Sequence, residues 1–198
     1  MIQTCEICNE PISKNIHTLN GMNVCHSCYA SLHKYLEGTI DPDSLTGFQI
    51  KMKHVVSDVL GDCRIISLPK YPYTLYSDLL GIISIKTSKL SNNKWLFDRG
   101  SFKLAPDTYI FVCLTSDKTS IEHVYIIPEN ASIFPKSGLT ITNSDIGLER
   151  FEEFEVESDI FNAIYQNINL EELPEFRNFY KTEQIKITGN VLTAPSTI

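Results

Sequence analysis

Two pairs of closely spaced cysteines stand near the start of the chain. Cys5 and Cys8 form one Cys-x-x-Cys pair, Cys25 and Cys28 form the other, and sixteen residues separate the pairs. Thiolates bind zinc well, and two such pairs at this distance are typical of one tetrahedral ion held by four sulfurs. Four cysteines complete the coordination shell and leave no position for water, so the pattern predicts a structural Zn²⁺ site and not a catalytic one.

Disulfides and free thiols are the alternatives to zinc. Two disulfides would need an oxidising compartment, and the chain opens without a signal-peptide pattern. We therefore expect a reduced, intracellular protein, cytoplasmic or nucleoid-associated. His17, His26 and His33 can also bind metals, but the cysteine set is already complete, so we expect these histidines at the surface or in packing contacts.

The elements around the cysteines follow from local signals. Asn20-Gly21 predicts a two-residue hairpin turn between the pairs, and residues 27–37 predict a helix that ends at Gly38. The expected order is a knuckle, a hairpin, a second knuckle and a helix, which is the order of elements in a treble clef. Residues 1–38 resemble small zinc modules of that kind. Residues 39–46 are polar and contain proline, which is typical of a linker.

The composition allows a substantial core and excludes a membrane span. The chain has 198 residues, of which 42% are hydrophobic, and no apolar run is long enough to cross a bilayer. The remaining cysteines, Cys63 and Cys113, have apolar neighbours, so we expect buried and unreactive thiols. We predict an α/β fold with a central mixed sheet flanked by helices over residues 47–157, followed by an acidic C-terminal extension at 158–198.

The residues that predict this sheet are β-branched and aromatic runs between turn signals. The expected helices cover residues 47–60, a stretch from about 143, and 160–168, and a Tyr-rich loop is expected at 69–73. Residues 109–114 lack polar alternation, which predicts a strand that is buried on both faces. The expected strands are 64–68, 74–76, 82–86, 95–97, 109–114, 123–127, 139–142 and, in the extension, 184–188.

Within the predicted sheet, an acid and a lysine stand at a spacing that can serve phosphate chemistry. Asp78 lies near a strand end, and Ser84 and Lys86 follow on one face of the next strand, because side chains repeat every two residues. An aspartate can hold a divalent metal against a phosphate, while a lysine orients water or stabilises developing charge. The Pro106-Asp107 pair follows the lysine strand, and we expect a turn there.

The segments around these residues resemble the core of the PD-(D/E)XK, or restriction-endonuclease-like, nucleases. The resemblance covers residues 47–157 and rests on short motifs: 77–81, 83–90, 95–97, 106–114, 125–128 and 148–156. It implies that Asp78 binds Mg²⁺ or Mn²⁺ and that Lys86 is the motif lysine. Ser84 stands where the second acid belongs and is a weaker metal ligand, so Asp58 on the preceding helix is a candidate replacement.

The resemblance implies a metal-dependent endonuclease that hydrolyses phosphodiester bonds in double-stranded DNA, with the zinc module positioning the DNA and a homodimer as the expected assembly. The net charge of −7 opposes nucleic-acid binding, but residues 151–198 carry −6 of it. Two alternatives stay open. Ser84 favours a catalytically degenerate nucleic-acid-binding protein, and the acidic extension favours a zinc-stabilised protein-interaction adaptor. A local basic strip offers DNA contacts: Lys86, Lys89, Lys94, Arg99 and Lys103.

Overall fold

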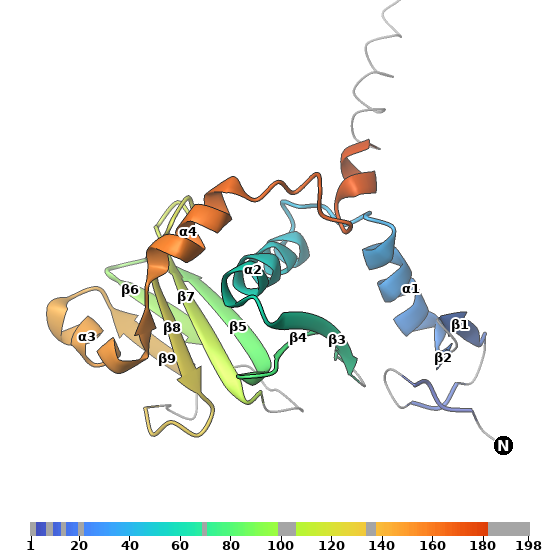
Figure 1. Cartoon of the computed structure of the whole chain (residues 1–198), viewed down its shortest axis with the longest axis horizontal. Coiled ribbons are helices and arrows are strands. Elements are labelled where there is room, and N and C mark those ends of the chain that lie inside the picture. Colours follow the sequence, from blue (N-terminus) through green and yellow to red (C-terminus); the bar gives the residue numbers. More distant parts are fainter. Residues whose placement is uncertain are drawn as a thin grey trace, which may run out of the picture. The chain divides into compact units, whose positions relative to one another are not determined.

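The computed structural model describes residues 3–6, 10–12, 15–19, 22–68, 71–98, 106–133 and 138–181. The chain forms two compact units (Figure 1). One unit comprises Met1–Lys51, Ser67–Pro72 and Asn169–Ile198, and the other comprises Met52–Ile66 and Tyr73–Ile168. No helix in these described ranges is long and apolar enough to cross a membrane.

The first unit contains a small hairpin that is followed by a helix. Strand β1 (His17–Leu19) pairs antiparallel with β2 (Met22–Val24), and helix α1 (His26–Leu36) follows directly. The predicted helix at 27–37 is confirmed to within one residue. The predicted turn at Asn20-Gly21 lies outside the described residues. Gly38 follows α1 at φ +62°, the left-handed conformation that commonly ends a helix.

The rest of the first unit joins residues that are far apart in the sequence. Ile40, Ile50 and Phe176 form a small buried core, with Leu170, Leu173 and Tyr180 packed around it. The Gly38 carbonyl accepts from the Phe179 amide, and a Cβ at position 38 would lie only 2.3 Å from the Pro174 carbonyl oxygen. Residues 169–181 therefore pack on the segment that we predicted as a linker, and residues 177–181 are helical.

Helix α2 (Leu45–Leu60) starts in the first unit and ends in the second. Its first turn is held by Ser44, whose hydroxyl accepts from the Gly47 amide at 3.0 Å. Met52, Val55 and Val56 are fully or almost fully buried, and their spacing of three and four residues places them on one face. The predicted helix at 47–60 is confirmed, with two more residues at its start.

The second unit is built on a six-stranded mixed sheet. Its strand order is β10-β8-β7-β5-β4-β3. Neighbours β5 and β7 run parallel, whereas β4–β5, β7–β8 and β8–β10 are antiparallel. The predicted α/β class and the mixed sheet are thereby confirmed. The strands are β3 (Cys63–Leu68), β4 (Tyr71–Ser77), β5 (Gly81–Lys89), β7 (Thr108–Leu114), β8 (Ile121–Pro128) and β10 (Glu155–Val156).

A two-stranded ribbon covers one face of this sheet. Strand β6 (Lys94–Asp98) pairs with β9 (Gly138–Thr142). Phe97 of the ribbon meets Phe111 of β7 edge to face at 5.0 Å, and the Trp95 indole Nε1 donates to the Leu114 carbonyl at 2.8 Å. The core between ribbon and sheet is aromatic and aliphatic: Trp95, Phe97, Tyr109, Phe111, Cys113, Tyr125, Ile127, Leu139, Ile141 and Phe151.

Every residue of β7 is buried, as its unbroken apolar sequence predicts. The ribbon core takes only alternate residues of β7, so the opposite face is covered as well. Helix α4 (Ser158–Asn167) lies along β8 and buries Phe161 and Tyr165, with the Tyr165 hydroxyl donating to the Lys118 carbonyl at 2.8 Å (Figure 1).

Two features differ from the expectations. Residues 71–73, expected in a loop, begin strand β4, because pairing within the sheet outweighs the local turn signal of Pro72. Strand β10 has only two residues and was not expected; it forms by pairing with Val124 and Tyr125 of β8. The remaining short elements are helix α3 (Asp145–Glu149), capped by Ser144, and the 3₁₀ turn Glu152–Phe154.

Candidate metal centre

Cys5 lies in a tight ribbon at the start of the first unit. Its amide donates to the Glu10 carbonyl at 2.9 Å, and the Ile12 amide donates to the Gln3 carbonyl at 2.8 Å. The Glu6 carboxylate accepts from the Asn23 amide of β2 at 2.8 Å, which ties the ribbon to the hairpin. The Cys5 side chain is fully buried.

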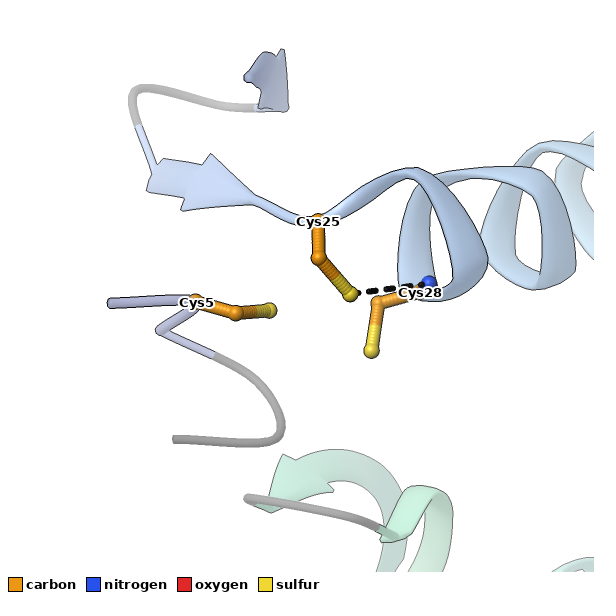
Figure 2. A group of neighbouring side chains, drawn as sticks. All are labelled: Cys5, Cys25 and Cys28. Atoms are coloured by element: carbon orange, nitrogen blue, oxygen red, sulfur yellow. Dashed lines mark hydrogen bonds between the residues drawn. The ribbon is translucent and has the colours of Figure 1, made fainter. Parts of the chain in front are cut away.

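Cys25 and Cys28 stand at the start of α1. Cys25 immediately precedes the helix and Cys28 lies in its first turn, where the unpaired amides and the helix dipole stabilise negative charge on sulfur. The Cys28 amide donates to the Cys25 Sγ at 3.5 Å (Figure 2). The start of α1 therefore carries two sulfurs that lie next to each other.

The three sulfurs gather at one point. The Sγ atoms of Cys5, Cys25 and Cys28 all lie within 4.8 Å of one another (Figure 2). Cys5 comes from the ribbon of residues 3–12, and Cys25 and Cys28 come from the start of α1. Sulfurs that share a tetrahedral zinc ion at a Zn–S distance of about 2.3 Å are separated by about 3.8 Å. All three are free thiols and none is joined to another described cysteine in a disulfide. The donor chemistry and spacing therefore suit a metal ion.

The predicted fourth sulfur belongs to Cys8, which lies outside the described residues. Among the described residues, no histidine belongs to the group of three sulfurs. His17, His26 and His33 instead form a line of rings with Tyr29 on β1 and α1, in which His17 and Tyr29 stack and the other neighbouring rings are tilted. The expectation that these histidines make packing contacts is confirmed.

Asp78 lies in the turn between β4 and β5. Its carboxylate pairs with the Arg64 guanidinium at 3.0 Å, and both side chains are more than half exposed, at 66% and 59%. The Arg64 guanidinium also lies 4.9 Å above the ring of Tyr76. An exposed pair of this kind stabilises the fold little, but it occupies the carboxylate that was predicted to bind magnesium.

Ser84 and Lys86 lie on one face of β5, as the two-residue repeat predicts. Their register partners on β7 are Tyr109 and Phe111, which belong to the core beneath the β6–β9 ribbon. Both side chains are half-buried on that ribbon-bearing face. Lys86 is five strand residues beyond Gly81, or about 16 Å along β5 from the turn that carries Asp78.

The other predicted site residues are dispersed. Asp58 is exposed on α2, and in the described part of the chain neither Asp58 nor Asp78 belongs to a metal-binding group of three. Lys89 ends β5 and Lys94 begins β6, so both lie at the turn between these strands. Arg99 and Lys103 lie outside the described residues.

Two acidic residues that the sequence reasoning missed hold the β4–β5 turn. Asp62 accepts from the Ser77 hydroxyl at 2.6 Å and from the Leu79 amide at 3.3 Å. The hydrogen bond from Ser77 is the main cause that lowers the pKa of Asp62. Asp107 accepts from the Ile82 amide at 2.8 Å. Both contacts join distant segments, so no local motif could have indicated them.

A histidine–carboxylate pair was also missed. His123 Nδ1 lies 2.6 Å from the Glu155 carboxylate and ties β8 to β10. The ring of His123 meets Trp95 edge to face at 5.5 Å. Cys113 stands opposite His123 in the register of β7 and β8. The thiol is fully buried, however, and burial strongly raises the pKa of Cys113, so it remains protonated and unreactive.

Cys63 is only half-buried, and burial raises the pKa of its thiol to about 11. The negative charge of Asp62 acts in the same direction. Both cysteines outside the metal group therefore carry neutral thiols near pH 7. The expectation of a fully buried side chain is confirmed for Cys113 alone.

Comparison of the sequence with protein-family models and with curated proteins gave no match.

Proposed function

We propose that this protein is a zinc-stabilised nucleic-acid-binding protein, with one structural Zn²⁺ held by Cys5, Cys8, Cys25 and Cys28. The convergence of three of these sulfurs supports the metal, and sulfur donors favour zinc over magnesium or calcium. The ion joins the Cys5 ribbon to α1 and so stabilises this part of the first unit.

The observation that carries nucleic-acid binding is a group of three lysines at one edge of the second unit, where Asp117 is the neighbouring acid in the loop after β7. Strands β5 and β7 run parallel with Lys89 opposite Leu114, so the loops that follow them emerge at one edge of the sheet. Lys89 and Lys94 flank the β5–β6 turn at this edge, and Lys118 lies in the β7–β8 loop. Three ammonium groups at one edge can neutralise neighbouring phosphates.

The β5–β6 turn between Lys89 and Lys94 is tight. Asn92 and Asn93 adopt positive φ angles of 51° and 58°, which form the tight hairpin turn that matches the strand twist. Ser91 and Lys94 exchange backbone hydrogen bonds across it at 3.0 and 3.1 Å. In the described part of the chain, neither Lys89 nor Lys94 forms an ion pair with a carboxylate.

Binding without hydrolysis fits the placement of the predicted catalytic residues. Asp78 is engaged by Arg64, and Lys86 lies about 16 Å farther along β5 on the ribbon-bearing face. Ser84 supplies no negative charge to a metal. Hydrolysis would require Asp78, Ser84 and Lys86 to lie around one metal ion and its bound phosphate. We therefore favour a protein that binds nucleic acid without cleaving it over an active endonuclease.

Fluorescence anisotropy with labelled double-stranded DNA and single-stranded RNA, across a salt series, tests the proposal. We expect salt-dependent binding, and Lys89→Ala or Lys94→Ala should each reduce the slope of log affinity against log salt by about 1. Arg64→Ala is the matched control, because it removes a cation from the opposite edge of the sheet and should leave the slope unchanged. Absence of binding to both nucleic acids would overturn the proposal in favour of a protein-interaction adaptor.

A plasmid-nicking assay with Mg²⁺ or Mn²⁺ separates binding from hydrolysis. We expect no cleavage by the natural sequence. Cleavage that disappears in both Asp78→Ala and Lys86→Ala proteins would contradict the binding-only proposal and establish the endonuclease that the resemblance implies.

A further inference from the structure

Two imidazole rings of the first unit point a nitrogen at each other. Nε2 of His17 on β1 lies 3.1 Å from Nδ1 of His26, the first residue of α1. The two ring centroids are 5.2 Å apart with an interplanar angle of 38°. The hairpin and the helix therefore each bring one imidazole nitrogen to the same place.

The surrounding rings fix this arrangement. His17 stacks on Tyr29 of α1 with centroids 4.1 Å apart and an interplanar angle of 11°. Tyr29 in turn contacts His33 one helical turn later, at 5.0 Å and 42°. Since Tyr29 and His26 belong to the same helix, one rigid element orients both imidazoles before any ligand arrives.

We propose that His17 and His26 form a second site, for an exchangeable divalent transition-metal ion, separate from the cysteine centre. At a metal–nitrogen distance of about 2.05 Å, nitrogens 3.1 Å apart subtend an angle of about 98° at the ion. That angle lies between the roughly 90° of octahedral and the roughly 109° of tetrahedral coordination. Without a metal, the same distance suits an N–H···N hydrogen bond; metal binding replaces it with two metal–nitrogen bonds, and the ion lies beside the line that joins the nitrogens.

The ligand type and exposure set the class of metal. Imidazole nitrogens bind nickel, copper and zinc and have little affinity for magnesium or calcium. His26 is exposed and His17 is half-exposed, so water or an external donor completes the coordination. Two protein ligands hold the ion more weakly than the cysteine centre does, and the bound ion can therefore exchange.

Two of the three remaining histidines of the described region pair with carboxylates. His33 pairs with Glu37 at 2.9 Å, four residues later on α1, and His123 pairs with Glu155. Neither places a nitrogen against a second imidazole. His33 belongs to the same line of rings as His17 and His26, so it offers a matched control at the same helix.

The experiment titrates Ni²⁺ into the full-length, zinc-loaded protein, with bound zinc established by metal analysis. Isothermal titration should show one equivalent of Ni²⁺ bound beyond the zinc. His17→Gln and His26→Gln should each lower the affinity of the protein for Ni²⁺ at least about tenfold. Loss of a residue that only orients a metal ligand already lowers metal affinity by about tenfold or more, and loss of the ligand itself should have at least the same effect. His33→Gln should leave the affinity unchanged.

Imidazole NMR signals of the natural sequence provide a second measurement that does not depend on the variants folding. Sub-stoichiometric Ni²⁺ is paramagnetic and should broaden the ring signals of His17 and His26 before those of His54 or His123. Uniform broadening of all histidines, no Ni²⁺ bound beyond the zinc, or unchanged affinity in well-folded His17→Gln and His26→Gln proteins would each overturn the proposal. The test is independent of the proposed nucleic-acid binding.

Discussion

Gly81, at the start of β5, provides a sharp test of how the β4–β5 turn is held. Its φ is +70°, and a Cβ at this position would lie 2.4 Å from an Asp107 carboxylate oxygen and 2.8 Å from the Asp107 Cβ. The same carboxylate accepts from the Ile82 amide at 2.8 Å. Gly81→Ala therefore adds backbone strain and also displaces the Asp107 side chain from its hydrogen bond.

The decrease in the free energy of unfolding that we expect for Gly81→Ala has two parts. An alanine in the left-handed conformation costs about 1 kcal/mol. Loss of a hydrogen bond to a charged acceptor adds about 1.5–3 kcal/mol, so Gly81→Ala should lower the free energy of unfolding by about 3 kcal/mol. Gly61 is the matched control: its φ is +73°, but a Cβ there meets no atom within 4 Å. Gly61→Ala should cost about 1 kcal/mol.

Urea unfolding followed by tryptophan fluorescence measures these costs. Trp95 is the single tryptophan of the chain and is fully buried in the same unit as Gly61 and Gly81. In an Asp107→Gly background both the carboxylate and the Cβ of residue 107 are absent, so Gly81→Ala should then cost no more than Gly61→Ala. Equal costs for the two glycine variants in the natural background, or an unchanged cost for Gly81→Ala in the Asp107→Gly background, would refute the reasoning.

Two further predictions concern metal and pH. Cys28→Ser should lower zinc affinity at least about 100-fold. Either this substitution or removal of zinc by a chelator should remove the far-UV signal of α1, while the Trp95-monitored urea transition stays in place; loss of both together would contradict a separately folded second unit. The hydrogen bond from the Thr115 hydroxyl, aided by those from Thr119, lowers the pKa of Asp117 to about 2. Because this folded-state pKa lies below the unfolded value of about 3.9, the carboxylate stabilises the fold above pH of about 4, and this stabilisation is lost as pH falls towards 2. Urea midpoints of the natural and Asp117→Asn proteins should therefore converge over that range, and a constant difference would contradict the assigned hydrogen bonds.

The sequence by itself determined the elements whose signals are local. The unbroken apolar run of β7 predicted a strand buried on both faces, and the structure confirms it. The two Cys-x-x-Cys pairs predicted a metal site, and three of the four sulfurs gather at one point. A strand period, a helix stop or a knuckle depends on neighbouring residues, so the order of residue types is sufficient to indicate it.

Only the tertiary structure decided which distant side chains meet. The sequence suggested Asp78 and Lys86 as partners, but Asp78 lies in a turn and pairs with Arg64, while β5 carries Lys86 away from that turn. The packing of residues 169–181 against residues 38–50 was likewise not indicated. The convergence of His17 and His26 depends on how the hairpin lies against α1. Such contacts depend on strand register and on packing between elements. Register and packing result from the burial of many side chains together, so the spacing of residues along the sequence does not indicate them.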